Sequence, residues 1–79
     1  MEENKKEILL KKLENINKII EKEANEKNYF KRGTIYKKLK NYSKAIEDYD
    51  KVIKLNSNDA GYYNGRGSAK YSLGEYKES

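Results

Sequence analysis

The positions of the apolar residues predict that most of the chain forms amphipathic helices. In the first third of the chain, large apolar residues recur at spacings of four, three and four: Leu9, Leu13, Ile16 and Ile20. This period places them on one face of a helix over residues 4–23, where neither Gly nor Pro occurs. Ile8, Leu10 and Ile19 widen that face. Lys and Glu balance on the polar side, which favours a helix packed against protein over one bound to a membrane surface.

The same period predicts three further helices, over residues 26–39, 42–55 and 60–73. Lys40–Asn41 forms the expected turn between the first two, because Asn suits turn backbone. The polar segment 56–59 ends the next helix and offers capping oxygens to the one that follows. We expect another turn at Gly74–Glu75, after which residues 76–79 begin a further helix.

Residues 24–28 form the weakest predicted boundary. Asn25 suits the N-cap of the helix over 26–39, but nothing in the segment forbids helix. One continuous helix over residues 4–39 therefore stays open as an alternative. Such a helix would separate the first segment from the rest and favour a swapped dimer.

A repeat with an offset of 34 links the helix over 26–39 to the helix over 60–73. Five residues recur at this offset: Tyr29, Arg32, Gly33, Leu39 and Tyr42 as Tyr63, Arg66, Gly67, Leu73 and Tyr76. A fixed period of this length is typical of stacked helical repeats. Gly33 weakens its helix, so we expect close approach of a neighbouring helix at this position. Gly67 holds the same place in the helix over 60–73, which Gly61 and Gly65 weaken, and we expect the face around Gly67 to be open.

The N-terminal helix resembles the helix over 42–55, because Leu13–Ile20 parallels Ile46–Ile53 at an offset of 33. It is therefore interpreted as a degenerate second helix of a preceding unit, acting as a cap. The predicted organisation is a capping segment over 1–25, a complete repeat over 26–59 and a partial repeat over 60–79. The expected fold is all-α, with antiparallel helix-turn-helix repeats in about four helices plus a truncated fifth.

Composition argues against several classes of site. The 79 residues include no Cys and no His, which removes disulfides, thiolate zinc sites and the usual general base. Gly65-Arg66-Gly67-Ser68 falls inside a predicted helix, so it does not form a phosphate loop. The acidic and amide residues over 48–59 lack the spacing of a calcium loop. We therefore expect no enzyme activity, no metal and no cofactor.

The net charge of +5 lies entirely in residues 29–79, because residues 1–28 hold seven Lys and seven Glu. A basic face on the repeat would attract acidic partners. The alternative interpretation is an ordinary solvated, lysine-rich surface. No apolar run is long enough for a membrane span and no secretory signal is seen, so we expect a cytoplasmic protein without a membrane partner.

The repeated residues resemble tetratricopeptide repeats, with one full unit over 26–59 and a partial one over 60–79. Seven positions of the full unit carry the resemblance: Tyr29, Gly33, Tyr36, Leu39, Tyr42, Ala45 and Tyr49. Arg32 stands at a position where the family usually has Leu, and Lys40 stands at the turn position where the family usually has Gly. Ser57 replaces the usual Pro between units, and Lys70 replaces the second aromatic residue.

This resemblance implies a scaffold for protein–protein interaction, in which the first helices line a concave peptide-binding groove. Residues at the matching places are Lys27, Phe30, Lys31, Thr34, Lys37 and Lys38 in the full unit, with Asn64, Ser68, Tyr71 and Ser72 in the next. The lysines would suit an acidic peptide or a C-terminal carboxylate. Phe30 and Thr34 stand where the family's clamp for chaperone tails has Lys and Asn, so that partner is not expected.

Two other interpretations remain. Tyrosines beside lysines could stack on nucleic-acid bases, although only Tyr62 and Tyr71 lie outside the expected core positions and nucleic acid is the less favoured partner. One complete repeat is fewer than the roughly three that such stacks need. Either the chain is a piece of a longer array, or it closes by self-association. We expect self-association, as a dimer or larger assembly, or a purely structural self-assembling repeat.

Overall fold

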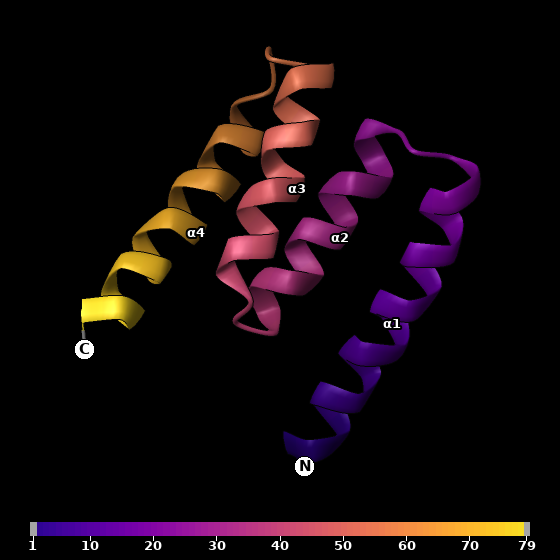
Figure 1. Cartoon of the computed structure of the whole chain (residues 1–79), viewed down its shortest axis with the longest axis vertical. Helices are drawn as coiled ribbons and strands as arrows, with labels where there is room; N and C mark the ends of the chain where they lie inside the picture. The colour runs from indigo at the N-terminus through magenta and orange to yellow at the C-terminus, as the bar shows by residue number, and fades with distance from the viewer. Residues whose placement is uncertain (1, 79) are drawn as a thin grey trace.

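Four α-helices lie side by side in one row, each antiparallel to its chain neighbour (Figure 1). They are α1 (Glu2–Lys22), α2 (Glu26–Lys38), α3 (Tyr42–Leu55) and α4 (Ala60–Glu78). The computed structural model describes the backbone of residues 2–78 and the side chains of residues 5–75. The Cα positions extend 35 × 30 × 15 Å, so the molecule is flattened along one axis. Helices α1 and α4 lie at the edges of the row, and the all-α expectation is confirmed.

The break between α1 and α2 is built by two asparagines. The Asn25 side chain accepts a hydrogen bond of 2.9 Å from the backbone N–H of Asn28, which makes Asn25 the N-cap of α2. The buried Asn28 amide donates to the Glu23 carbonyl at 2.9 Å, which satisfies a backbone group left free where α1 ends. The alternative of one continuous helix over residues 4–39 is therefore wrong.

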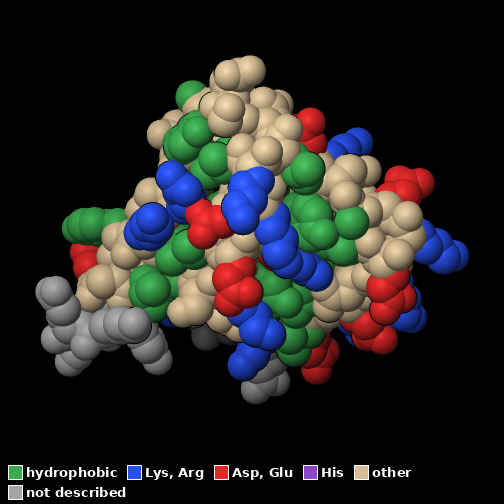
Figure 2. All heavy atoms as spheres, turned by 45° about the horizontal axis from the view of Figure 1, so that its top comes forward, with side chains coloured by type: hydrophobic (Ala, Val, Ile, Leu, Met, Phe, Trp, Pro, Cys, Tyr) green, Lys and Arg blue, Asp and Glu red, His purple; other side chains and the backbone are tan. Residues whose placement is uncertain are grey.

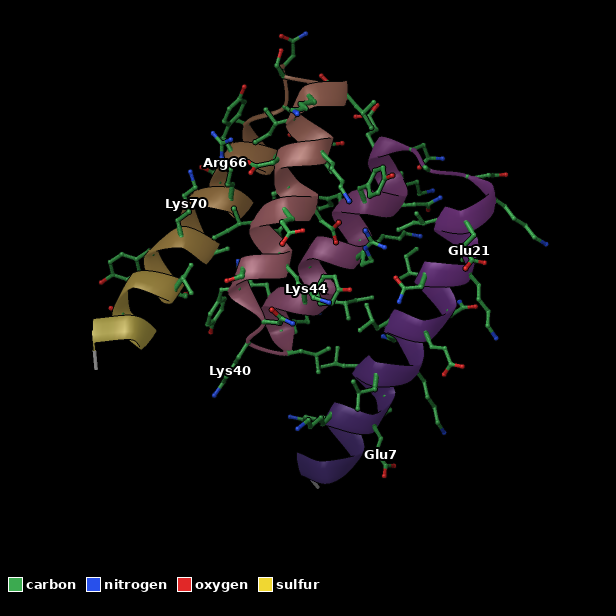
Figure 3. All side chains as sticks on the ribbon, in the orientation of Figure 1. Glu7, Glu21, Lys40, Lys44, Arg66 and Lys70 are labelled. Carbon is green, nitrogen blue, oxygen red and sulfur yellow. The ribbon has the colours of Figure 1, made fainter. Side chains whose placement is uncertain are left out.

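The turn between α2 and α3 forms where it was expected. Lys40 adopts φ 66°, a left-handed conformation that ends many helices. Asn41 then caps α3 by accepting from the backbone N–H of Lys44 at 3.5 Å. In Figure 3 Lys40 lies at this turn, at the end of the α2–α3 pair, and its side chain is exposed. Gly would be the easier residue for this backbone.

The expected turn at Gly74–Glu75 is wrong, because α4 continues without a break to Glu78. At Lys40, the cost of reversing the backbone is offset because α3 packs against α2. Beyond Glu75 the described residues offer no such packing, and continued helical hydrogen bonding is then the better arrangement. The described backbone therefore holds four helices, and the repeat position of Tyr76 concerns a side chain outside the described residues.

The core centres on Tyr49, whose side chain is only 1% exposed. Its ring lies between two glycines: a Cβ at Gly33 of α2 would be 3.0 Å from Cε1, and one at Gly65 of α4 would be 3.1 Å from Cζ. The Phe30 ring packs on it at a centroid distance of 5.7 Å. Tyr49 thus joins three helices. The buried apolar residues found among the described side chains are Ile16, Ala45, Tyr49, Val52 and Ala69.

An ion pair braces the same helices. Arg32 donates from Nε and Nη2 to the two carboxylate oxygens of Asp48, each at 2.8 Å, and from Nη1 to Asn17 Oδ1 at 3.0 Å. The Asp48 side chain is 2% exposed and that of Arg32 is 17% exposed. On α4, Arg66 donates to Asp50 at 2.9 Å in a more open setting. Each arginine therefore bonds to the helix that precedes its own, and Arg32 also bonds to the helix that follows.

Gly33 and Gly67 should respond in opposite ways to replacement by Ala. At Gly33 the new methyl would lie 3.0 Å from Tyr49 and 3.2 Å from Asp48, so overpacking of about 1–3 kcal/mol outweighs the gain in helix propensity. At Gly67 no atom lies within 4 Å of the new methyl, so Gly67→Ala should stabilise by about 1 kcal/mol. The open face expected around Gly67 is found, because no described helix lies on that side of α4.

Urea unfolding followed by circular dichroism measures both changes, and each variant serves as the control for the other. Stabilisation by Gly33→Ala would contradict the close approach of α3 at this position.

Candidate functional site

A groove of about 390 Å³ lies between α1 and α2, at an edge of the row. From α1 its lining residues are Lys12, Asn15, Ile16 and Ile19, and from α2 they are Phe30, Lys31, Thr34 and Ile35. The four hydrophobic residues of this set make an apolar floor. On the face seen in Figure 2, hydrophobic side chains also reach the surface between lysine and arginine side chains.

The α2 side of the groove is held in place from behind. Phe30 packs against Tyr49, and against the Tyr62 ring of α4 at a centroid distance of 5.1 Å. The Thr34 hydroxyl donates to the Phe30 carbonyl at 3.0 Å and lies 3.2 Å from the Tyr49 hydroxyl. These contacts fix the backs of both side chains, so the α2 side of the groove is a preformed surface.

The α1 side is more open. Ile16 is buried against α2, with 5% of its surface exposed, whereas Ile19 is 38% exposed. Lys12 and Lys31 are exposed at the rim. No lining residue is acidic, so the groove combines an apolar floor with positive charge at the rim. That combination suits an apolar side chain beside a carboxylate.

Only part of the predicted binding face lies at this groove. Phe30, Lys31 and Thr34 line it. The other predicted residues of α2 are Lys27 and Lys38, which are exposed, and Lys37, which is partly exposed. On α4, Asn64, Ser68 and Tyr71 are exposed and Ser72 is partly buried, and none of the four lines the groove. The structure thus separates the predicted set into a groove on α2 and open surface on α4.

Sequence reasoning missed the contribution of α1. Lys12, Asn15, Ile16 and Ile19 share one side of that helix, and Ile35 joins them from α2. A signal was present, because the apolar face of α1 is wider than one neighbouring helix can cover. The assignment of α1 as a simple cap concealed this second face.

Most tyrosines near the surface already hold a cation or a hydrogen bond. Arg32 and Lys51 lie 5.6 and 5.2 Å from the Tyr29 ring centroid, and Arg66 lies 5.4 Å from that of Tyr63. Tyr62 was expected to be free, but its hydroxyl donates to Glu26 at 3.0 Å. This hydrogen bond raises the pKa of Tyr62, because it favours the protonated phenol. Tyr71, at 70% exposed, remains open to solvent.

Within residues 5–75, no group of three or more acidic side chains is arranged so that it could hold a metal ion. No helix in the described part of the chain has both the length and the apolar character that a bilayer span requires.

Comparison with known families agrees with the repeat seen in the sequence and in the helix pairing. Residues 27–59, which comprise α2, α3 and the segment up to α4, match the model of the tetratricopeptide repeat family. No solved structure matches the chain. Repeats of this family generally mediate protein–protein interaction and typically act as scaffolds without enzyme activity. The matched pair of helices, with its fixed-period echo in α4, supports a tetratricopeptide repeat over residues 27–59.

Proposed function

We propose that this protein is an interaction scaffold whose groove between α1 and α2 receives an apolar segment of a protein partner with acidic residues beside it. The observation that carries the proposal is the groove itself, with four hydrophobic residues on its floor and Lys12 and Lys31 at its rim. An apolar side chain in such a groove removes hydrophobic surface of both molecules from water, at about 25 cal/mol per Å². A neighbouring carboxylate gains from both lysines.

The remaining basic residues extend this surface along α2. Lys27 and Lys38 are exposed on the same helix, and they can contact the acidic residues of a longer peptide. Exposed pairs of this kind contribute roughly 0–1 kcal/mol each. The groove therefore supplies the anchor, and the lysines contribute mainly to association rate and selectivity.

The proposal is tested by selecting binders from a phage-displayed library of random short peptides against the intact chain. Enriched peptides should combine large apolar residues with Asp or Glu. Their affinity, measured by fluorescence anisotropy with labelled peptides, should fall about tenfold in Lys31→Glu and in Ile19→Asp. The first variant reverses the charge at the rim and the second places a carboxylate on the apolar floor.

Lys54→Glu is the matched control, because Lys54 is exposed on α3 and lines no part of the groove. It applies the same change of charge as Lys31→Glu and should leave the affinity unchanged. Equal loss of affinity in Lys54→Glu and Lys31→Glu would show a general charge effect and overturn the proposal. Peptides that bind the Ile19→Asp variant as tightly as the parent would also overturn it.

A further inference from the structure

The two edge helices each carry an uncovered face with the same spacing. On α1 the exposed residues Ile8, Lys12, Asn15 and Ile19 follow one another at intervals of four, three and four. On α4 the exposed residues Tyr63, Gly67, Lys70 and Gly74 do the same. Ile8 is 51% exposed and Tyr63 is 40% exposed, and no atom lies within 4 Å of a Cβ built at Gly67 or Gly74. Lys70 is labelled in Figure 3, where it extends from α4 away from α3.

The inner pair of helices indicates how these two faces could meet. Positions of α2 correspond to those of α4 at the offset of 34, and positions of α3 correspond to those of α1 at the offset of 33. Contacts follow the same correspondence, because Arg32 bonds to Asn17 as its counterpart Arg66 bonds to Asp50, the counterpart of Asn17. Helix α1 therefore precedes α2 in the manner in which α3 precedes α4.

We propose that copies of this chain associate head to tail, with α4 of one copy packed against α1 of the next as α2 packs against α3 within each copy. In the inner pair, Gly33 faces Asp48 and Tyr49. At the corresponding places Gly67 faces Asn15 and Ile16 of the next copy. This inference rests on the proposed function in one respect, because it uses the groove that contains Asn15, Ile16 and Ile19. The occupant here is a second copy of the chain, which offers Lys70 and not a carboxylate to Lys12.

The lengths of the edge helices agree with this arrangement. Helix α2 ends at Lys38, which corresponds to Ser72, whereas α4 continues six residues further, to Glu78. Helix α3 begins at Tyr42, which corresponds to Leu9, whereas α1 begins seven residues earlier, at Glu2. In the head-to-tail arrangement these two extensions lie beside each other, antiparallel and of nearly equal length. The association then continues without closing into a symmetric dimer.

One position gives the association a distinctive dependence on charge. In the inner pair, Tyr36 of α2 packs against the buried cluster that contains Ala45 of α3. Lys70 corresponds to Tyr36 and Lys12 corresponds to Ala45, so two lysines face each other across the proposed contact. Their repulsion weakens with added salt, so association should strengthen as the salt concentration rises. Lys70→Glu should tighten association about tenfold, and adding Lys12→Glu to that variant should remove the gain.

Complementary variants test the orientation by sedimentation velocity, from about 10 μM to about 1 mM. The parent chain should form species that grow with concentration. Ile19→Asp blocks the α1 face, and Gly67→Lys blocks the α4 face while entering open space in the single copy. Each variant should remain a monomer alone. An equimolar mixture should form a pair, because the α4 face of the Ile19→Asp variant can pack on the α1 face of the Gly67→Lys variant. The pair should not grow, because its two outer faces are both blocked.

Lys54→Glu is again the control and should associate as the parent does, and circular dichroism verifies that every variant is helical. A parent chain that stays monomeric to about 1 mM, or variants that fail to pair when mixed, would overturn the inference. Continued self-association of Gly67→Lys would overturn it as well. If the parent is monomeric but selected peptides still bind its groove, the proposed function stands and only the inference fails. If neither peptide binding nor self-association is found, both proposals fail.

Discussion

Replacing Tyr49 with Ala is expected to unfold most of the protein at room temperature. The change removes a ring that is 1% exposed and touches α2 through Gly33 and α4 through Gly65. Truncation of a buried aromatic residue costs about 3–5 kcal/mol. A domain of this size has a stability of only a few kcal/mol, so a loss of this size removes most or all of it. Phe30 of α2, which also contacts both α3 and α4, packs on the Tyr49 ring and would lose that contact as well.

The measurement is urea unfolding followed by helix circular dichroism. Tyr49→Phe keeps the ring and loses only the hydroxyl contact with Thr34 at 3.2 Å, so it should cost about 1 kcal/mol. Tyr71→Ala removes a tyrosine that is 70% exposed and should change the stability by less than about 0.5 kcal/mol. A Tyr49→Ala variant within about 1 kcal/mol of the parent would contradict the central position of this residue.

Replacing Asp48 with Ala should have the next largest effect, about 3–5 kcal/mol. The substitution leaves the Arg32 guanidinium partly buried and without the carboxylate that accepts its two hydrogen bonds of 2.8 Å. Breaking one side of a buried pair is costly because the remaining charge has lost its water and its partner. Asp50→Ala is the matched control, since it breaks the exposed pair with Arg66 and should cost at most about 1 kcal/mol.

A double variant distinguishes the value of the ion pair from the cost of an unpaired arginine. Arg32→Met combined with Asp48→Ala removes both charges, so it should be more stable than Asp48→Ala alone. Equal or greater loss in the double variant would contradict this explanation. Urea unfolding of the two variants in parallel provides the comparison.

The stability of the protein at alkaline pH depends on the protonation of Arg32. Its hydrogen bond to Asp48 raises the pKa of the guanidinium, against the opposing effect of burial. A raised pKa means that the stabilisation is present in full below the ordinary pKa of arginine and is lost only as the pH rises beyond it. The contribution of Arg32 to stability should therefore stay constant through neutral and moderately alkaline solution.

The sequence by itself determined where α2 and α3 lie in the chain and that α4 repeats α2. Apolar spacing located α2 and α3, and the offset of 34 related α4 to α2, because helical period and repeat length are local properties of the chain. Ala45, Tyr49 and Val52 follow one another at helical spacings of four and three, and all three are buried. Asn25 was named as a possible cap and forms that cap, because a side chain three residues from its backbone donor needs no tertiary contact.

Tertiary structure decided what lies against each helix. Gly65 was expected only to weaken α4, but it receives the Tyr49 ring. Gly67 matches Gly33 in sequence, yet it faces open space because no described helix packs there. The groove also depends on α1, whose second apolar side could be assigned only after α2 had covered the first. Helix length and burial at the edges of the row depend on which neighbours are present, and neighbours are not a local property of sequence.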